Sequence, residues 1–126
     1  MLSKEMNQLR NGFRTITEGH KKSLTSADRV LDVLVESDKW MEGVRVMCSG
    51  QAEGDTLSME IVHPVYGVVD TFGANVNIDP TTFMQINNKS KYWAKLLTGL
   101  TVRLSYHTTQ TTDVKLYVDF YFHKEK

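Results

Sequence analysis

The residues best suited to catalysis or metal binding are the four histidines and the single cysteine. His107 and Asp113 stand on either side of a polar run, and a hairpin turning at residues 109–111 would bring them side by side. A carboxylate beside an imidazole orients the ring and raises its pKa, as general-base catalysis requires. The pair would lie at an exposed loop tip, so we expect a surface contact there and no catalytic site.

The other candidates give no chemical signature. His20 and His63 have no metal-ligating residue at suitable spacing on the same element, and His123 is expected to face solvent. Cys48 has apolar neighbours on a predicted strand, which favours a buried structural thiol over a nucleophile. The glycines form no phosphate-binding run. We therefore expect that the protein is not an enzyme and has no cofactor and no metal site.

The composition is that of a globular protein of single-domain size, with 126 residues, 40% apolar and 24% charged. The formal net charge is zero, which argues against a nucleic-acid partner bound through counterion release. The charge is uneven, because residues 1–25 carry five basic and two acidic side chains, whereas residues 26–80 carry three basic and ten acidic ones. Such a chain could complement itself within one molecule or between copies.

No segment indicates export or a membrane. No apolar run approaches the roughly 18–20 residues of a membrane span, and the N-terminus lacks the apolar region of a secretory signal. One cysteine cannot form an intrachain disulfide. We expect synthesis in a cytoplasm, no membrane partner and no nucleic-acid partner.

The strongest pattern is the alternation of apolar and polar residues in Leu100–His107 and Val114–His123. Period two predicts strands with one buried face. A turn at residues 109–111 would join the two stretches as a hairpin with every apolar side chain on one face. In that register Leu104 faces Leu116, Val102 faces Val118 and Leu100 faces Phe120.

The opposite face of this terminal hairpin would carry aromatic and charged residues. Its members are Arg103, Tyr117, Asp119 and Tyr121. Such a face can stack on a ligand, or a neighbouring subunit can cover it, since Tyr suits surfaces that are part dry and part wet. Because the net charge is zero, we favour the covered face.

The N-terminal segment shows the second pattern, an apolar seam spaced four, three, four and three residues apart. The seam consists of Leu2, Met6, Leu9, Phe13 and Ile16. It predicts an amphipathic helical arm, residues 1–24, before a single β-rich domain, residues 25–126. The seam either packs on its own domain or forms an assembly interface with copies of the chain or with a partner.

The middle of the chain mixes helix and strand signals. The stripe in residues 26–42 favours a helix, although Leu31, Val33 and Val35 would equally form one face of a strand. Residues 43–78 predict a β-meander. Asp79-Pro80 is a good helix opening, and a helix is expected over residues 80–98.

Together these patterns predict an α+β fold with an antiparallel sheet of about five strands, two packed helices and the N-terminal arm. The alternative is an all-β two-sheet sandwich or jelly roll with an N-terminal helix, in which residues 29–36 and 82–87 are strands.

The function expected is a non-catalytic assembly subunit that forms a homo-oligomer or docks onto a larger multi-copy assembly, such as a virion, through its arm. The alternative is a small-ligand or carbohydrate-binding module. Its pocket would use tyrosines of the terminal hairpin face together with Tyr66 and Trp40 or Trp93.

Overall fold

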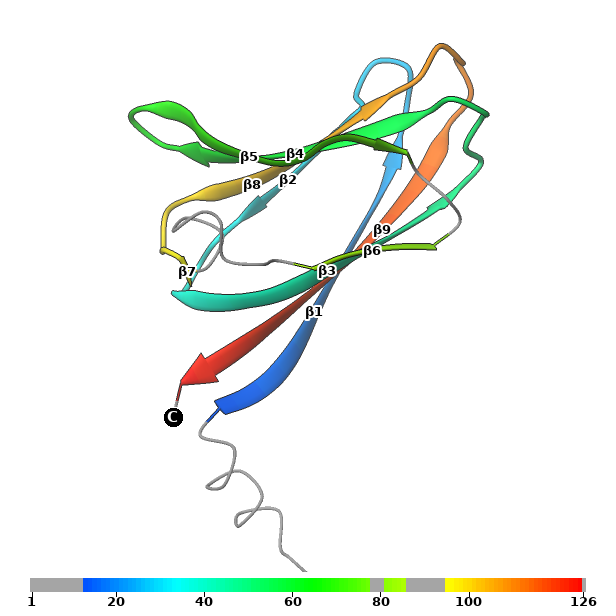
Figure 1. Cartoon of the computed structure of the whole chain (residues 1–126). Helices are drawn as coiled ribbons and strands as arrows, with labels where there is room; N and C mark the ends of the chain where they lie inside the picture. The colour runs from blue at the N-terminus through cyan, green and yellow to red at the C-terminus, as the bar shows by residue number, and fades with distance from the viewer. Residues whose placement is uncertain (1–12, 78–80, 86–94, 126) are drawn as a thin grey trace, which may run out of the picture.

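The computed structural model describes residues 13–77, 81–85 and 95–125, which form two antiparallel β-sheets packed face to face (Figure 1). The strands are β1 (Phe13–Leu24), β2 (Val30–Leu34), β3 (Lys39–Ser49), β4 (Thr56–His63), β5 (Gly67–Asn77), β6 (Thr81–Gln85), β7 (Lys95–Leu96), β8 (Thr101–His107) and β9 (Val114–Glu125). Within these ranges no helix is long and apolar enough to cross a membrane.

The strand order identifies the architecture. The first sheet has the order β1-β9-β3-β6, with the short β7 added beside the start of β3, and the second has the order β2-β8-β4-β5. The chain passes back and forth between the sheets, and β4–β5 is a hairpin within the second. Two four-stranded sheets connected in this way form a double-sheet jelly roll.

The core lies between the two sheets and is built by strict alternation. In β8, Val102, Leu104 and Tyr106 are buried, and in β9, Leu116 and Val118 are buried. The residues between them are more exposed. Each sheet therefore contributes one apolar face, as period two requires.

The predicted terminal hairpin is wrong, because β8 and β9 belong to different sheets. Val102 pairs with Val33 and Ile61, whereas Val118 pairs with His20 and Val46. Alternation indicates which face of a strand is buried but does not identify the neighbouring strand. The polar residues 108–113 connect the two layers, and the apolar faces meet across the core.

The predicted α+β fold is also wrong, since the described residues contain no helix. Residues 26–42 include β2 and the start of β3, and their buried residues Leu31, Val33 and Val35 recur at period two. The described parts of residues 80–98 are β6, β7 and a turn. The two layers of the alternative are present, with strands at β2 and β6.

The predicted helical arm is corrected from Phe13 onward, where the chain is a strand paired with β9 along its whole length. Residues 1–12, with Leu2, Met6 and Leu9, lie outside the described residues. Of the inward-facing positions of β1 from Ile16 onward, three are polar: Glu18, His20 and Lys22. An edge strand tolerates polar residues there because one side of it lies outside the core. The division into an arm and a domain stays a prediction.

Candidate functional site

The jelly roll separates the residues that the hairpin would have gathered on one face. Arg103 lies on β8 in the second sheet, where its guanidinium donates to both carboxylate oxygens of Asp32, at 2.9 and 3.1 Å. Tyr117, Asp119 and Tyr121 lie on β9 in the first sheet. The three β9 residues stay together because they are two positions apart, and Arg103 does not join them.

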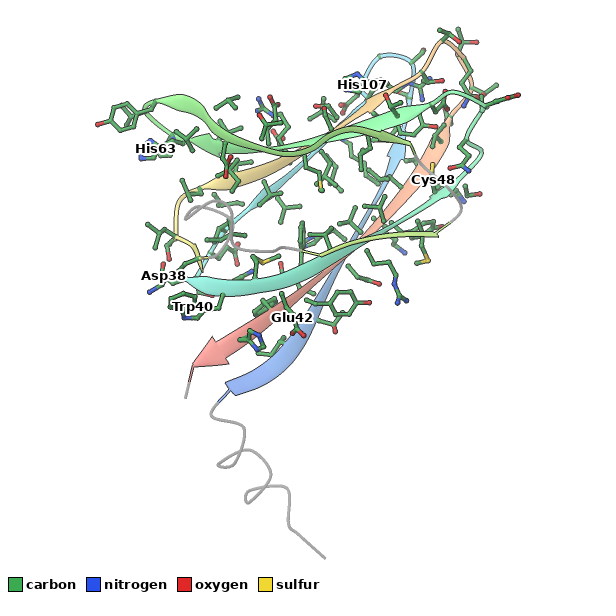
Figure 2. The ribbon with its side chains drawn as sticks, in the orientation of Figure 1. Asp38, Trp40, Glu42, Cys48, His63 and His107 are labelled. Carbon is green, nitrogen blue, oxygen red and sulfur yellow. The ribbon has the colours of Figure 1, made fainter. Side chains whose placement is uncertain are left out.

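Strand pairing adds new members to the β9 group. β3 places Arg45 opposite Asp119 and Met47 opposite Tyr117. Figure 2 shows Trp40 on the side of β3 that faces away from the second sheet. We call this outer surface of the first sheet the tyrosine face. It consists of Trp40, Arg45, Met47, Tyr117, Asp119 and Tyr121.

Two cations lie over aromatic rings of the tyrosine face. The guanidinium of Arg45 lies 5.9 Å from the ring centre of Tyr121, and the ammonium of Lys95 lies 4.8 Å from that of Trp40. Trp40 and Tyr117 are 39% and 36% exposed. The face can therefore stack on a planar or sugar-like group, or bury aromatic area against another protein.

A cleft of about 500 Å³ opens between the edges of the two sheets. We call it the edge cleft. β1 contributes Ile16, Glu18 and His20, and β2 contributes residues 32–34. Residues 36–38, Lys39 and Phe122 complete the lining. Ile16, predicted to lie at an assembly interface, is half-buried and packs against the core.

Lys39 organises the inside of this cleft. It is 9% exposed, and its Nζ donates to Glu18 Oε2 at 2.6 Å and lies 4.8 Å from the ring centre of Phe122. His20 Nε2 lies 2.7 Å from Glu18 Oε1. Burial works to raise the pKa of Glu18, but the hydrogen bonds from Lys39 and His20 outweigh it and hold that pKa below its usual value.

Asp38, on the loop before β3, lines one end of the cleft with its carboxylate. The backbone N–H and the hydroxyl of Thr98 donate to it, both at 2.8 Å. These hydrogen bonds, that from the backbone N–H above all, lower the pKa of Asp38. Asp38 therefore stays charged in the ordinary pH range and anchors the turn after β7.

A buried polar network occupies the opposite end of the sandwich. Asp55 is 5% exposed, and its Oδ2 accepts hydrogen bonds from the Tyr106 hydroxyl, from Gln110 Nε2 at 3.1 Å and from the backbone N–H of Ala52 at 2.9 Å. Burial works to raise the pKa of Asp55, but its hydrogen bonds, that with Thr108 first, hold it below the usual value. Burial raises the pKa of Tyr106, and the nearby Asp55 raises it further.

This network ties loops together. Gln110 also donates to the carbonyl of Gly50 at 3.0 Å, and Arg29 donates to the carbonyls of Gln110 and Thr112 at 2.9 and 3.1 Å. The loops after β1, β3 and β8 thus share one set of contacts at the same end of the molecule (Figure 1). Its chemistry is structural, because the donors and acceptors satisfy one another.

The remaining sequence candidates are dispersed. His107 Nε2 lies 2.9 Å from the Ser58 hydroxyl, and Asp113 is exposed. His63 Nδ1 accepts the backbone N–H groups of Val65 and Tyr66, so it shapes the β4–β5 turn. Within the described ranges, no group of three His, Cys, Asp or Glu side chains could hold a metal ion.

Cys48 is half-buried on β3, opposite the buried Leu116. Burial raises the pKa of its thiol, which disfavours the nucleophilic thiolate. Tyr66 is 77% exposed at the tip of β4–β5 in the second sheet, away from the tyrosine face. Trp93 lies outside the described residues.

Sequence reasoning missed Asp55 and Lys39, although each had a visible signal. Asp55 is an even number of positions from Leu57, Met59 and Ile61, which are all buried, so it falls on the same side of the chain. Lys39 is two positions before the buried Met41, on the same side of β3. A charged residue on the buried side of a strand predicts a hydrogen-bonding or charged partner nearby, because a buried charge needs one.

Comparison with protein-family models gives no match for this sequence, and comparison with curated protein sequences gives no significant match.

Proposed function

We propose that the protein is a non-catalytic assembly subunit that forms a homo-oligomer or docks onto a larger multi-copy assembly, such as a virion. The observation that carries the proposal is the tyrosine face, which groups Trp, Tyr, Met and Arg side chains on one open side of a sheet. These residue types are enriched in protein interfaces and supply most of their hot spots.

The architecture supports the proposal by analogy alone. Double-sheet jelly rolls occur in viral capsid domains, lectins and cupins, so the fold is compatible with a particle component and with other roles. The N-terminal residues Leu2, Met6 and Leu9 supply a second apolar contact in this proposal. The oligomer would then use both a sheet face and the segment before β1.

Light scattering of the full chain over micromolar concentrations tests the proposal. We expect a defined oligomer, and we expect Tyr117→Ser to shift it toward monomer because the substitution removes exposed aromatic area. Val65→Ser is the matched control, since Val65 is 78% exposed in the β4–β5 turn of the other sheet. A chain that stays monomeric at all concentrations, with its N-terminal segment protected from protease, would contradict the proposal.

The same face supports a second candidate, a carbohydrate or small-ligand binding module. Exposed aromatic rings of the face can stack on sugar or heterocycle planes. Trp40 lies on the face, so ligand binding should change the tryptophan fluorescence, and Trp40→Phe should remove that change. A flat response across a broad panel of glycans and metabolites favours the assembly role.

A further inference from the structure

The edge cleft lies where both sheets end. Its walls come from β1 and β2, which are terminal strands of the two sheets in the described part of the chain. Ile16, Val33 and Phe122 give it an apolar lining, and Leu34 is 56% exposed at its margin. Its volume of about 500 Å³ lies within the range of about 300–1,000 Å³ that is usual for ligand pockets. The cleft can therefore accept apolar side chains.

The cleft is also acidic. Four carboxylates line it, against one ammonium group from Lys39 and the guanidinium of Arg103 that pairs with Asp32, which leaves a balance of −2 with the histidine neutral. The carboxylates belong to Glu18, Asp32, Glu36 and Asp38. Glu36 is exposed and forms no ion pair with any described residue. A ligand that fits this cleft combines apolar groups with positive charge.

The segment before β1 has this chemistry. It carries two basic side chains, Lys4 and Arg10, against one acidic side chain, Glu5. Its large apolar residues are Leu2, Met6 and Leu9. β1 begins at Phe13, and Ile16 of the same strand already lines the cleft. The segment therefore starts close to a surface of complementary charge and polarity.

We propose that residues 2–10 of one copy of the chain bind in the edge cleft of a second copy. This inference rests on the proposed assembly function and names the surface through which copies meet. The apolar side chains of the segment pack on the half-buried Ile16 and on Leu34, which is 56% exposed. Its basic side chains approach the acidic margin, where Glu36 supplies an available carboxylate.

Binding within one chain is less favourable. The chain would have to reverse at Asn11 and Gly12, a dipeptide that favours two-residue hairpin turns. Such a turn would place Glu5 directly opposite Glu18, and like charges in that position are destabilising. The apolar residues, four and three apart, would also fall on both faces of the added strand. A segment from a second copy need not pair with β1 as a strand, so neither constraint applies to it.

The first test measures the dissociation constant of the full-length oligomer by light scattering. We expect Met6→Ser in the segment, and Leu34→Ser or Glu36→Lys in the cleft, to raise it at least tenfold. Val65→Ser and Glu53→Lys are the matched controls because both residues are exposed elsewhere. Each control should change the constant less than threefold.

The second test identifies the partner surface directly. Full-length Met6→Cys and Leu34→Cys chains, both carrying Cys48→Ala, are mixed and treated with a short bismaleimide. We expect a crosslinked heterodimer from this mixture, and much less from Met6→Cys mixed with Val65→Cys. Equal yields from the two mixtures would overturn the inference.

The outcomes separate the inference from the proposed function. An oligomer that persists unchanged in the cleft variants overturns the inference and leaves the assembly function standing. Crosslinking only within single chains of the Met6→Cys/Leu34→Cys double variant shows binding in cis and also overturns it. A wild-type chain that is monomeric throughout overturns the inference, and with its N-terminal segment protected from protease it also overturns the assembly function.

Discussion

The ammonium of Lys39 lies 2.6 Å from the carboxylate of Glu18 and spans the intervening strand β9. Lys39 opens β3, whereas Glu18 lies in the middle of β1. The contact therefore links two strands that do not pair with each other. It also places a charge pair against the ring of Phe122, at the inner end of the edge cleft.

Removing the ammonium should destabilise the fold. In Lys39→Met, the half-buried carboxylate of Glu18 loses its strongest partner, and a polar group left unsatisfied in this way costs about 1–3 kcal/mol. We expect the free energy of unfolding in urea to fall by that amount. Lys115→Met is the control, because Lys115 is exposed on β9 and should change stability by less than about 0.5 kcal/mol. Equal effects would contradict the structural role of the pair.

Removing the hydroxyl of Tyr106 should lower the free energy of unfolding, although the ring stays in place. Tyr106→Phe keeps the ring in the core but leaves the buried Asp55 carboxylate without one of its donors. We expect a loss of about 1–3 kcal/mol in urea unfolding. Tyr117→Phe is the control, since Tyr117 is exposed. A neutral effect of Tyr106→Phe would show that the other donors to Asp55 suffice.

The same pair predicts how stability depends on pH. The pKa of Asp55 is lowered from 3.8, so its contribution is present above that value and is lost as the pH falls through the native pKa. The pKa of Tyr106 is raised from 10.0, so its contribution is complete below that value and is lost progressively as the pH rises above it. We therefore expect these two groups to contribute a constant amount to the thermal midpoint between pH 3.8 and 10.0. Above this range the midpoint should fall less steeply in Tyr106→Phe than in the wild-type chain.

Two glycines form a matched pair for testing the turn after β3. Gly50 and Gly54 both have positive φ, +91° and +87°. A Cβ at Gly50 would lie 3.2 Å from the carbonyl oxygen of Asp113, whereas one at Gly54 would meet nothing within 4 Å. We expect Gly54→Ala to cost about 1–2 kcal/mol from the backbone alone and Gly50→Ala to cost more. Equal losses in urea unfolding would show that the Asp113 contact relaxes freely.

The buried faces of the long strands could be predicted from the sequence, but not their partners. Alternation assigns the buried sides of β8 and β9 correctly, because a half-buried strand has period two. Whether the next strand joins the same sheet depends on the path of residues 108–113. Those residues are held by the Asp55 network, whose members are far apart in the chain, as Asp55 and Gln110 are. No local pattern contains this information.

β1 and β2 were misassigned for opposite reasons. The inward-facing residues of β1 include Glu18, His20 and Lys22, so an edge strand lacks the apolar alternation that marks a central one. The apolar residues of β2 are dense enough to imitate a helical stripe. The same ambiguity affects the candidate site, because the tyrosine face depends on the pairing of β3 with β9. β9 alone shows only part of that face.

The positions of β8 and β9 have a consequence for synthesis. β9 lies between β1 and β3, and β8 lies between β2 and β4, so a central strand position in each layer is filled only after β1 to β7 have been synthesised. Until residues 101–125 leave the ribosome, the nascent chain can form only partial pairings such as the β4–β5 hairpin, which is marginal alone. Folding of the two sheets must then wait for these residues and depend on long-range pairing, which is slow. Meanwhile the apolar strands remain accessible to chaperones.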